Sequence, residues 1–146
     1  MVNSRQKGKQ FEYKICKKLE EVTNRKWTTS PQSGGVATRT GNLALAGDIL
    51  PKNFKCDYVF ECKKYKEIRL EELLKGTGNL PKWVKQLERE KGKRPGILIW
   101  SENYGKIYCM AEYKEYIEGT FRYGKYLIGL FDDIMPKVLS KYVKEK

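Results

Sequence analysis

The sequence predicts an α/β domain in which a β-sheet packs against amphipathic helices. Residues 4–23 place apolar side chains at the spacing of one helical face. Residues 57–63 and 96–100 are short runs rich in apolar, β-branched and aromatic side chains, which is typical of buried strands. Such segments alternate with helix-like ones along a chain of 146 residues, a length typical of one domain. We therefore expect a single domain over residues 1–146.

The first predicted helix, residues 4–23, combines an apolar arc with a basic stripe. At about 100° per residue, the arc is formed by Phe11, Ile15, Cys16, Leu19 and Val22. A neighbouring stripe is formed by Lys7, Lys14, Lys18 and Arg25. Glu12 lies inside the apolar arc, which is an unusual place for a solvated glutamate. It is therefore a candidate for a functional group.

The other elements follow in order along the chain. The segment 28–47 is rich in Gly, Ser and Thr and is predicted to be a long loop. Further strands are predicted at 48–50, 57–63, 96–100 and 107–111, with a turn at 51–56. Helices are predicted at 67–74, 81–90 and 112–118. The tail 121–146 is apolar up to Met135 and then helical and basic, which indicates a docking or dimerisation element.

The composition favours a nucleic-acid partner. Lys and Arg number 30 against 18 Asp and Glu, and this net charge of +12 favours a polyanion over a merely basic, soluble surface. The absence of histidine excludes a histidine base and a Ser–His triad, and the four scattered cysteines disfavour a zinc site. No run reaches the ~20 apolar residues of a membrane span, and no signal peptide is visible. We therefore expect a cytoplasmic protein with reduced cysteines and no membrane partner.

Two carboxylates and a lysine form the central candidate site. Glu61 and Lys63 are two residues apart on a predicted strand, so they face the same side, while Cys62 faces the core. Pairing Asp48 with Glu61 in an antiparallel hairpin centres the turn between Phe54 and Lys55, inside the predicted turn. Their Cβ atoms would then lie roughly 5 Å apart, and two such carboxylates repel unless a cation lies between them. Oxygen ligands without histidine favour Mg²⁺ or Mn²⁺.

Other residues have roles with open alternatives. Lys63 would hold the attacking water or neutralise charge on a phosphate, although a Glu-x-Lys on a strand is usually a solvated salt bridge. Glu12 would ligate a second ion or orient a water. Ser33 would hydrogen-bond a phosphate oxygen, although a serine beside glycines more often forms a turn. Gln86, on the helix predicted at 81–90, is more typical of the surface than of a site.

These residues resemble the signature of the PD-(D/E)xK nucleases. Gly47-Asp48 is followed, thirteen positions after the aspartate, by Glu61-Cys62-Lys63, with Gly47 where the signature carries Pro. Within that superfamily, the chain resembles the archaeal-type Holliday junction resolvases, including those carried by viruses. The resemblance covers about residues 4–111, which would form the nuclease core, whereas a C-terminal extension at about 119–146 has no counterpart.

The resemblance implies a restriction-endonuclease-like mixed central β-sheet flanked by α-helices. It also implies a homodimer that makes paired, Mg²⁺-dependent nicks at a four-way DNA junction. The catalytic positions would be taken by Glu12, Ser33, Asp48, Glu61 and Lys63. The metal ligands would be Glu12, Asp48, Glu61 and the backbone carbonyl of Cys62.

We therefore expect a structure-specific endonuclease that resolves Holliday junctions in DNA recombination and repair. A restriction-like or repair endonuclease of the same superfamily is the first alternative, with the same chemistry on another DNA substrate. A non-catalytic basic DNA-binding module, with a Glu-x-Lys pattern by chance, is the second. Loss of cleavage with retained junction binding after Asp48→Ala would separate an enzyme from such a module.

Overall fold

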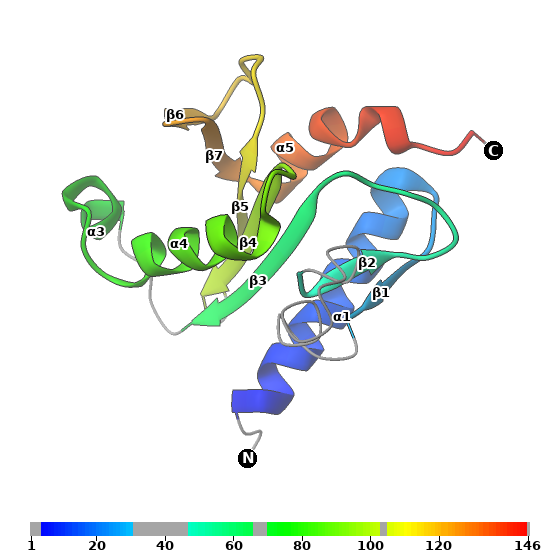
Figure 1. Ribbon diagram of the computed structural model, residues 1–146, viewed down its shortest axis with the longest axis horizontal. Helices are drawn as coiled ribbons and strands as arrows, with labels where there is room; N and C mark the ends of the chain where they lie inside the picture. Colours follow the sequence, from blue (N-terminus) through cyan, green and yellow to red (C-terminus); the bar gives the residue numbers. More distant parts are fainter. Residues whose placement is uncertain (1–3, 31–46, 66–69, 103–104, 146) are drawn as a thin grey trace.

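A computed structural model describes residues 4–30, 47–65, 70–102 and 105–145 of the chain. Seven strands form one sheet, and helices cover both of its faces (Figure 1). In chain order the elements are α1 (Ser4–Thr23), β1 (Trp27–Thr29), β2 (Ile49–Pro51), β3 (Val59–Tyr65), α3 (Leu70–Lys75), α4 (Asn79–Lys91), β4 (Gly96–Glu102), β5 (Ile107–Glu112), β6 (Phe121–Tyr123), β7 (Tyr126–Leu130), α5 (Phe131–Val138) and a 3-10 turn (Ser140–Tyr142).

The sheet is mixed, as the resemblance implies. Its strand order is β1-β2-β3-β4-β5-β7-β6. β3 and β4 are parallel and are joined by the crossover that contains α3 and α4, whereas the other neighbouring strands are antiparallel. The α/β prediction with a mixed central sheet flanked by helices is therefore confirmed.

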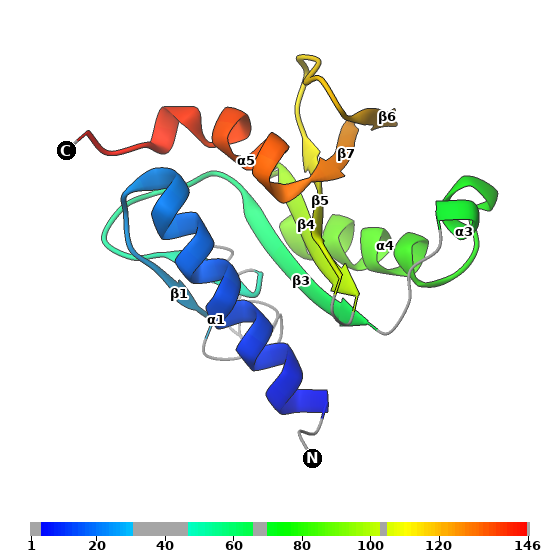
Figure 2. The ribbon, with the colours of Figure 1, turned by 180° about the vertical axis from the view of Figure 1, so that it is seen from behind.

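The two faces of the sheet carry separate cores. On one face, α1 and α5 pack over β3–β5 through side chains such as Ile15, Phe60 and Ile134 (Figure 2). On the other face, α4 packs through Leu80 and Leu87 against alternate residues of the same strands. Alternate strand residues are apolar on both sides because both faces are covered. On the α4 face of β3, the apolar pattern is interrupted by two charged residues, Glu61 and Lys63.

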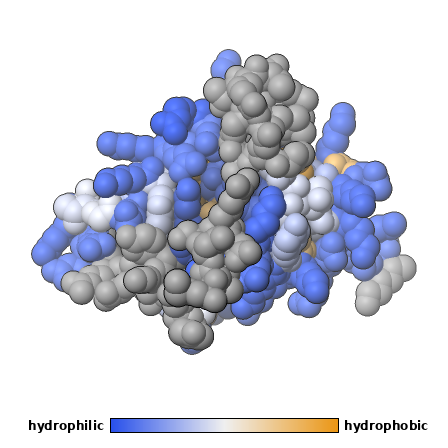
Figure 3. Space-filling model, turned by 90° about the horizontal axis from the view of Figure 1, so that it is seen from below, coloured by the Kyte–Doolittle hydropathy of each residue, from blue (hydrophilic) through white to orange (hydrophobic). Residues whose placement is uncertain are grey.

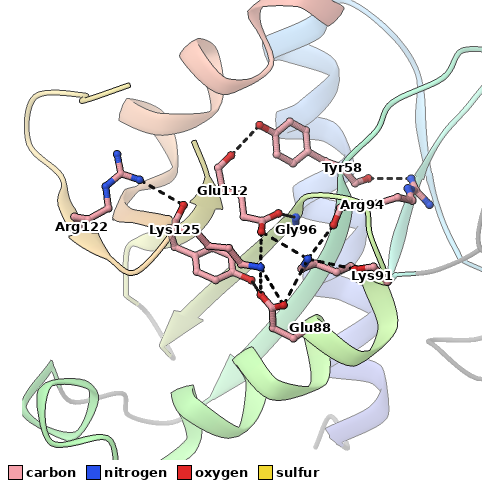
Figure 4. A network of polar contacts seen from close by, with 10 residues as sticks. Tyr58, Glu88, Lys91, Arg94, Gly96, Glu112, Arg122 and Lys125 are labelled. Atoms are coloured by element: carbon pink, nitrogen blue, oxygen red, sulfur yellow. Dashed lines mark hydrogen bonds and ion pairs between the residues drawn. The ribbon is translucent and has the colours of Figure 1, made fainter. Parts of the chain in front are cut away.

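Helix α4 approaches β4 closely because position 96 has no side chain. A Cβ added to Gly96 would lie 2.9 Å from Leu87 Cδ2 and from Lys91 Cδ. Beside this contact lies a group of charges that we call the balanced cluster, Glu88, Lys91, Glu112 and Lys125 (Figure 4). Lys91 is only 5% exposed, and its Nζ lies 3.5 Å from Glu88 Oε2 and 3.6 Å from Glu112 Oε1.

The balanced cluster connects α4 to β5 and to the β6–β7 hairpin at the edge of the sheet. Lys125 Nζ, on the turn between β6 and β7, lies 2.9 Å from Glu88 Oε1 and 2.8 Å from Glu112 Oε1. Tyr126 donates a hydrogen bond to Glu88, and the Gly96 N–H donates one of 2.7 Å to Glu112. The C-terminal turn of α4 is thus fixed relative to β4, β5 and β7.

Arg94 fixes the segment that leads into β3. Its guanidinium donates hydrogen bonds to the carbonyl oxygens of Cys56, Asp57 and Tyr58, at 3.1, 3.0 and 3.3 Å (Figure 4). These hydrogen bonds connect the start of β3 to the turn before β4, and they fix the register of β3 along its parallel neighbour β4.

The structure corrects two expectations about the C-terminal third. The helix predicted at 112–118 is wrong, because residues 113–120 form bends and turns between β5 and β6. The tail is not simply apolar and then helical, since β6 and β7 form a hairpin at the edge of the sheet and α5 begins at Phe131. Residues 121–138 are therefore built into the fold.

Two further expectations concern cysteines and membranes. All four cysteines are buried free thiols, as expected for a reduced protein. Within the four described ranges, no helix combines the length and the hydropathy that crossing a membrane requires.

Candidate active site

Asp48 is positioned by backbone contacts on both sides. Ile49 pairs with Phe60 in the antiparallel ladder of β2 and β3, which is the register predicted from the turn. The Asp48 N–H donates a 2.7 Å hydrogen bond to the Phe60 carbonyl. The Asp48 carboxylate accepts a 2.8 Å bond from the Cys62 N–H through Oδ2. Asp48 is 4% exposed, so its carboxylate is held inside the protein against the middle of β3.

Gly47 permits this arrangement. Its φ is +95°, and a Cβ at this position would lie 2.6 Å from the Phe60 carbonyl oxygen. Both facts exclude a side chain, and proline is excluded as well because its ring fixes φ near −65°. The glycine at the signature's proline position is thus a requirement of this backbone.

Glu61 and Lys63 point to the α4 side of β3, as their spacing predicts. Glu61 is 1% exposed, and Cys62 faces the opposite core beneath α1. Lys63 Nζ donates a 2.9 Å hydrogen bond to Gln86 Oε1 on α4. Gln86 is half-buried, and its side chain faces Lys63, which is the less expected of the two positions considered for it.

Glu12 comes from α1 and is buried, as its place in the apolar arc indicates. It is 8% exposed, and its Oε1 lies 3.6 Å from Lys9 Nζ. Lys9 also donates a hydrogen bond of 3.2 Å to the Ser30 carbonyl. Burial and the negative charge of Asp48 raise the pKa of Glu12 to about 7, against a smaller opposite effect of Lys9.

Glu90, which the sequence did not single out, completes a group of four acids. It lies one turn after Gln86 on α4, and Gln86 Nε2 donates a 3.3 Å hydrogen bond to its Oε1. Its carboxyl group contacts that of Glu61. The one available signal was the four-residue spacing from Gln86, which places both on one helical face. We call Glu12, Asp48, Glu61 and Glu90 the carboxylate cluster.

The carboxylate cluster is short of positive charge. Among the described residues, Glu12 Oε1, Glu61 Oε1 and Glu90 Oε2 are buried without a hydrogen-bond partner. Burial, the Glu90 carboxyl group and the charge of Asp48 raise the pKa of Glu61 well above its usual value. Buried oxygens without donors are costly unless a cation or water satisfies them. The site therefore has the electrostatics of a divalent-cation site.

The ligand set also fits a hard cation. Within the described ranges, no group of three or more Asp, Glu, Cys or His side chains is arranged so that it could hold a metal ion. Mg²⁺ does not need such a cage, since it is usually bound by one or two carboxylates and keeps several waters. In a strand, the N–H and C=O of one residue point to the same side. The Cys62 carbonyl therefore faces the side on which Asp48 bonds the Cys62 N–H.

One predicted site residue cannot be placed. Ser33 falls in the segment 31–46, which lies outside the described residues.

Comparison with known proteins identifies the family. A model of the family described as "Phage putative PDDEXK endonuclease" matches residues 3–131. The chain belongs to this family. It is thus a member of the PD-(D/E)xK superfamily of nucleases, which typically use divalent metal ions such as Mg²⁺. The matched residues include Asp48, directly before β2, and Glu61 on β3, and they extend through β7 to the first residue of α5.

One curated relative matches part of the chain. Protein D14 of Escherichia phage T5 is 38% identical over 94 residues, which is 61% of this chain and 57% of that protein. The chain thus aligns with little more than half of the relative's length. No solved structure matches the chain.

Proposed function

We propose that this protein is a divalent-metal-dependent DNA endonuclease that nicks four-way junctions as a homodimer. The observation that carries the nuclease activity is the buried Asp48–Glu61 pair. Asp48 accepts a hydrogen bond from β3, Glu61 lies on β3, and Glu61 Oε1 has no hydrogen-bond partner in the described part of the chain. The family match supports the reaction class. The junction and the homodimer rest on the resemblance of the Gly47-Asp48 and Glu61-Cys62-Lys63 signature to the archaeal-type resolvases.

Asp48, Glu61 and the Cys62 carbonyl would hold a Mg²⁺ ion, and Mn²⁺ would substitute for it. The bound ion would supply a water of lowered pKa and polarise the scissile phosphate. Glu12 and Glu90 flank this position from α1 and α4 and would bind waters or a second ion. Ser33 would contact a phosphate oxygen.

Lys63 would stabilise the negative charge that grows on the phosphate. Its ammonium group is held by the side-chain amide of Gln86. Hydrogen bonds at the oxygen and at the nitrogen of this amide fix its orientation. Oε1 accepts from Lys63, while Nε2 donates to Glu90. An ammonium held in place before the substrate arrives stabilises developing charge without reorganisation.

A nicking assay tests the proposal. Labelled four-way junction, splayed and linear DNA are incubated with the protein in Mg²⁺, in Mn²⁺ and in EDTA. We expect metal-dependent nicks in the junction. Asp48→Asn should lower the rate by at least about 100-fold while junction binding is retained, since even residues behind metal ligands cost 10–100-fold. Asp57→Asn is the matched control, because this exposed aspartate pairs with Lys141 away from the site.

The outcomes separate the parts of the proposal. Equal cutting of linear DNA would refute the junction preference and favour a restriction-like or repair nuclease. Absence of cleavage in either metal, with junction binding intact, would favour a binding module. A monomer in light scattering, with and without DNA, would refute the homodimer, which must hold two active sites at a fixed separation.

A further inference from the structure

The lysines of the basic stripe on α1 differ in whether an acidic side chain lies nearby. Lys7, Lys14 and Lys18 lie on one side of the helix, with Phe11 between the first two. Lys18 has a partner on α5, because its Nζ lies 3.2 Å from Asp132 Oδ1 and 5.2 Å from the centre of the Phe131 ring. Lys7 and Lys14 are exposed, and none of the described carboxylates lies within ion-pair distance of them.

Lys64 adds a third ammonium group to this part of the stripe. It directly follows Lys63, so its side chain points to the opposite face of β3, toward α1. Its Nζ lies 5.5 Å from the centre of the Phe11 ring. Phe11 is buried between the two elements, and it therefore brings Lys64 to the helix side that carries Lys7 and Lys14.

The charges of these three lysines are not compensated by the described residues. Lys64 Nζ lies over the ring of Phe11, which separates Lys7 from Lys14 on α1, and no described carboxylate forms an ion pair with it. Like charges held together in this way repel, so the arrangement is favourable only when an anion joins it. The same end of the molecule, where α1 begins and β3 ends, presents a largely hydrophilic surface in its described residues (Figure 3).

We propose that Lys7, Lys14 and Lys64, the lysine cluster, bind a backbone phosphate of the DNA on the α1 side of β3. The inference rests on the proposed function, since it assumes that DNA is the substrate. Lys63 and Lys64 are consecutive residues that point to opposite faces of β3, so the bound phosphate would lie on the α1 side of the strand that carries Glu61 and Lys63. The cluster would position the strand without reading its sequence.

The salt dependence of DNA binding tests this proposal. Binding of a labelled four-way junction is measured by anisotropy in EDTA, where cleavage does not interfere, at several NaCl concentrations. The logarithm of the binding constant falls against log salt with a slope of about −0.9 per neutralised phosphate. The double variant Lys14→Gln/Lys64→Gln should therefore lower the magnitude of the slope by about 1.

A matched variant controls for total charge. Lys18→Gln/Lys137→Gln removes two positive charges as well, but Lys18 is paired with Asp132 and Lys137 is on the exposed side of α5. It should keep the wild-type slope. Thermal melting should show that both double variants fold, since relief of repulsion at Lys64 does not destabilise the protein.

Three results would overturn the proposal. The first is an unchanged slope in Lys14→Gln/Lys64→Gln. The second is an equal decrease in the control variant, which would mean that only total charge matters. The third is stabilisation of wild type by inorganic phosphate, lost in the variant, without any change in the DNA slope. Because binding is measured without metal, a failed nicking assay leaves this result interpretable.

Discussion

Helix α4 contributes to two groups of charged side chains that differ in how their charges are compensated. In the balanced cluster, Glu88 and Glu112 are matched by Lys91 and Lys125, and the buried ammonium of Lys91 also donates to two carbonyl oxygens (Figure 4). In the carboxylate cluster, the cations near the four acids are Lys9 and Lys63, as far as the described residues show. Three of its buried oxygens have no hydrogen-bond partner among the described residues.

The difference shows how the same residue types serve two purposes. A buried ion pair whose atoms are all satisfied fixes the elements that it connects. A buried carboxylate without donors lowers stability and is expected where a ligand completes the site. The balanced cluster therefore anchors α4, and the carboxylate cluster uses the helix so anchored to place Gln86 and Glu90.

The largest effect on stability is expected when the buried cation of the balanced cluster is removed. Lys91→Met should lower the free energy of unfolding by about 3–5 kcal/mol, because it removes the buried cation and leaves the two half-buried carboxylates with one partner. Urea denaturation measures the change. Lys125→Met is the control at the rim, where the side chain is 51% exposed, and it should cost about 1 kcal/mol or less. Similar losses of stability in both variants would contradict the view that the buried Lys91 stabilises the fold more than the exposed Lys125.

A change of opposite sign is expected in the carboxylate cluster. Glu61→Gln should raise the free energy of unfolding in EDTA by about 1–3 kcal/mol, because the raised pKa of Glu61 makes the folded protein take up a proton or keep a buried charge there, and an amide requires neither. The same variant should lose the increase in melting temperature that Mg²⁺ or Ca²⁺ gives the wild type. Glu71→Gln, an exposed glutamate paired with Lys75, should change neither value. Destabilisation of Glu61→Gln in EDTA would refute the comparison.

The smallest effect concerns acid stability. Burial opposes ionisation of Glu88, but hydrogen bonds from Tyr126 and Lys125 prevail and lower its pKa. A lowered pKa gives stability that is present above the unfolded value, about 4.3, and is lost as the pH falls through the folded value. Between about pH 5 and 3, wild type should therefore lose more stability than Glu88→Gln. The difference should be under about 1 kcal/mol, because the side chain is 37% exposed.

Thermal melting at several pH values checks this prediction. Glu12 and Glu61 have raised pKa values and titrate with the opposite sign, but they are present in both proteins and cancel in the comparison. A steeper acid loss in Glu88→Gln would show that the hydrogen bonds of Glu88 do not stabilise its charged form.

The part of the site on neighbouring strands was predictable from sequence. Strand alternation placed Glu61 and Lys63 on one face, and turn length placed Asp48 beside them, because both rules act over short distances. Glu90 was not predictable in this way. Its role depends on how α4 lies across β3, and that position is determined by side-chain packing and by the balanced cluster.

The same contrast between local sequence rules and tertiary packing applies to the secondary structure. The helix predicted at residues 4–23 matches α1, because its periodicity is long and strong. The β6–β7 hairpin was missed because β6 has three residues and β7 five, and β7 is stabilised by pairing with β5. Short strands depend on such partners more than on their own composition.

Gly47 has a consequence for the recognition of distant relatives. A search that requires the proline of the signature would pass over this chain, although its aspartate is held at the expected place beside the strand that carries Glu61. Here the backbone of Gly47 lies so close to the backbone of Phe60 that residue 47 cannot carry a side chain. Relatives with this backbone should be sought by a glycine before the aspartate and by the distance to Glu-x-Lys. Proline and glycine at this position would then mark two backbone solutions to the same placement of a carboxylate.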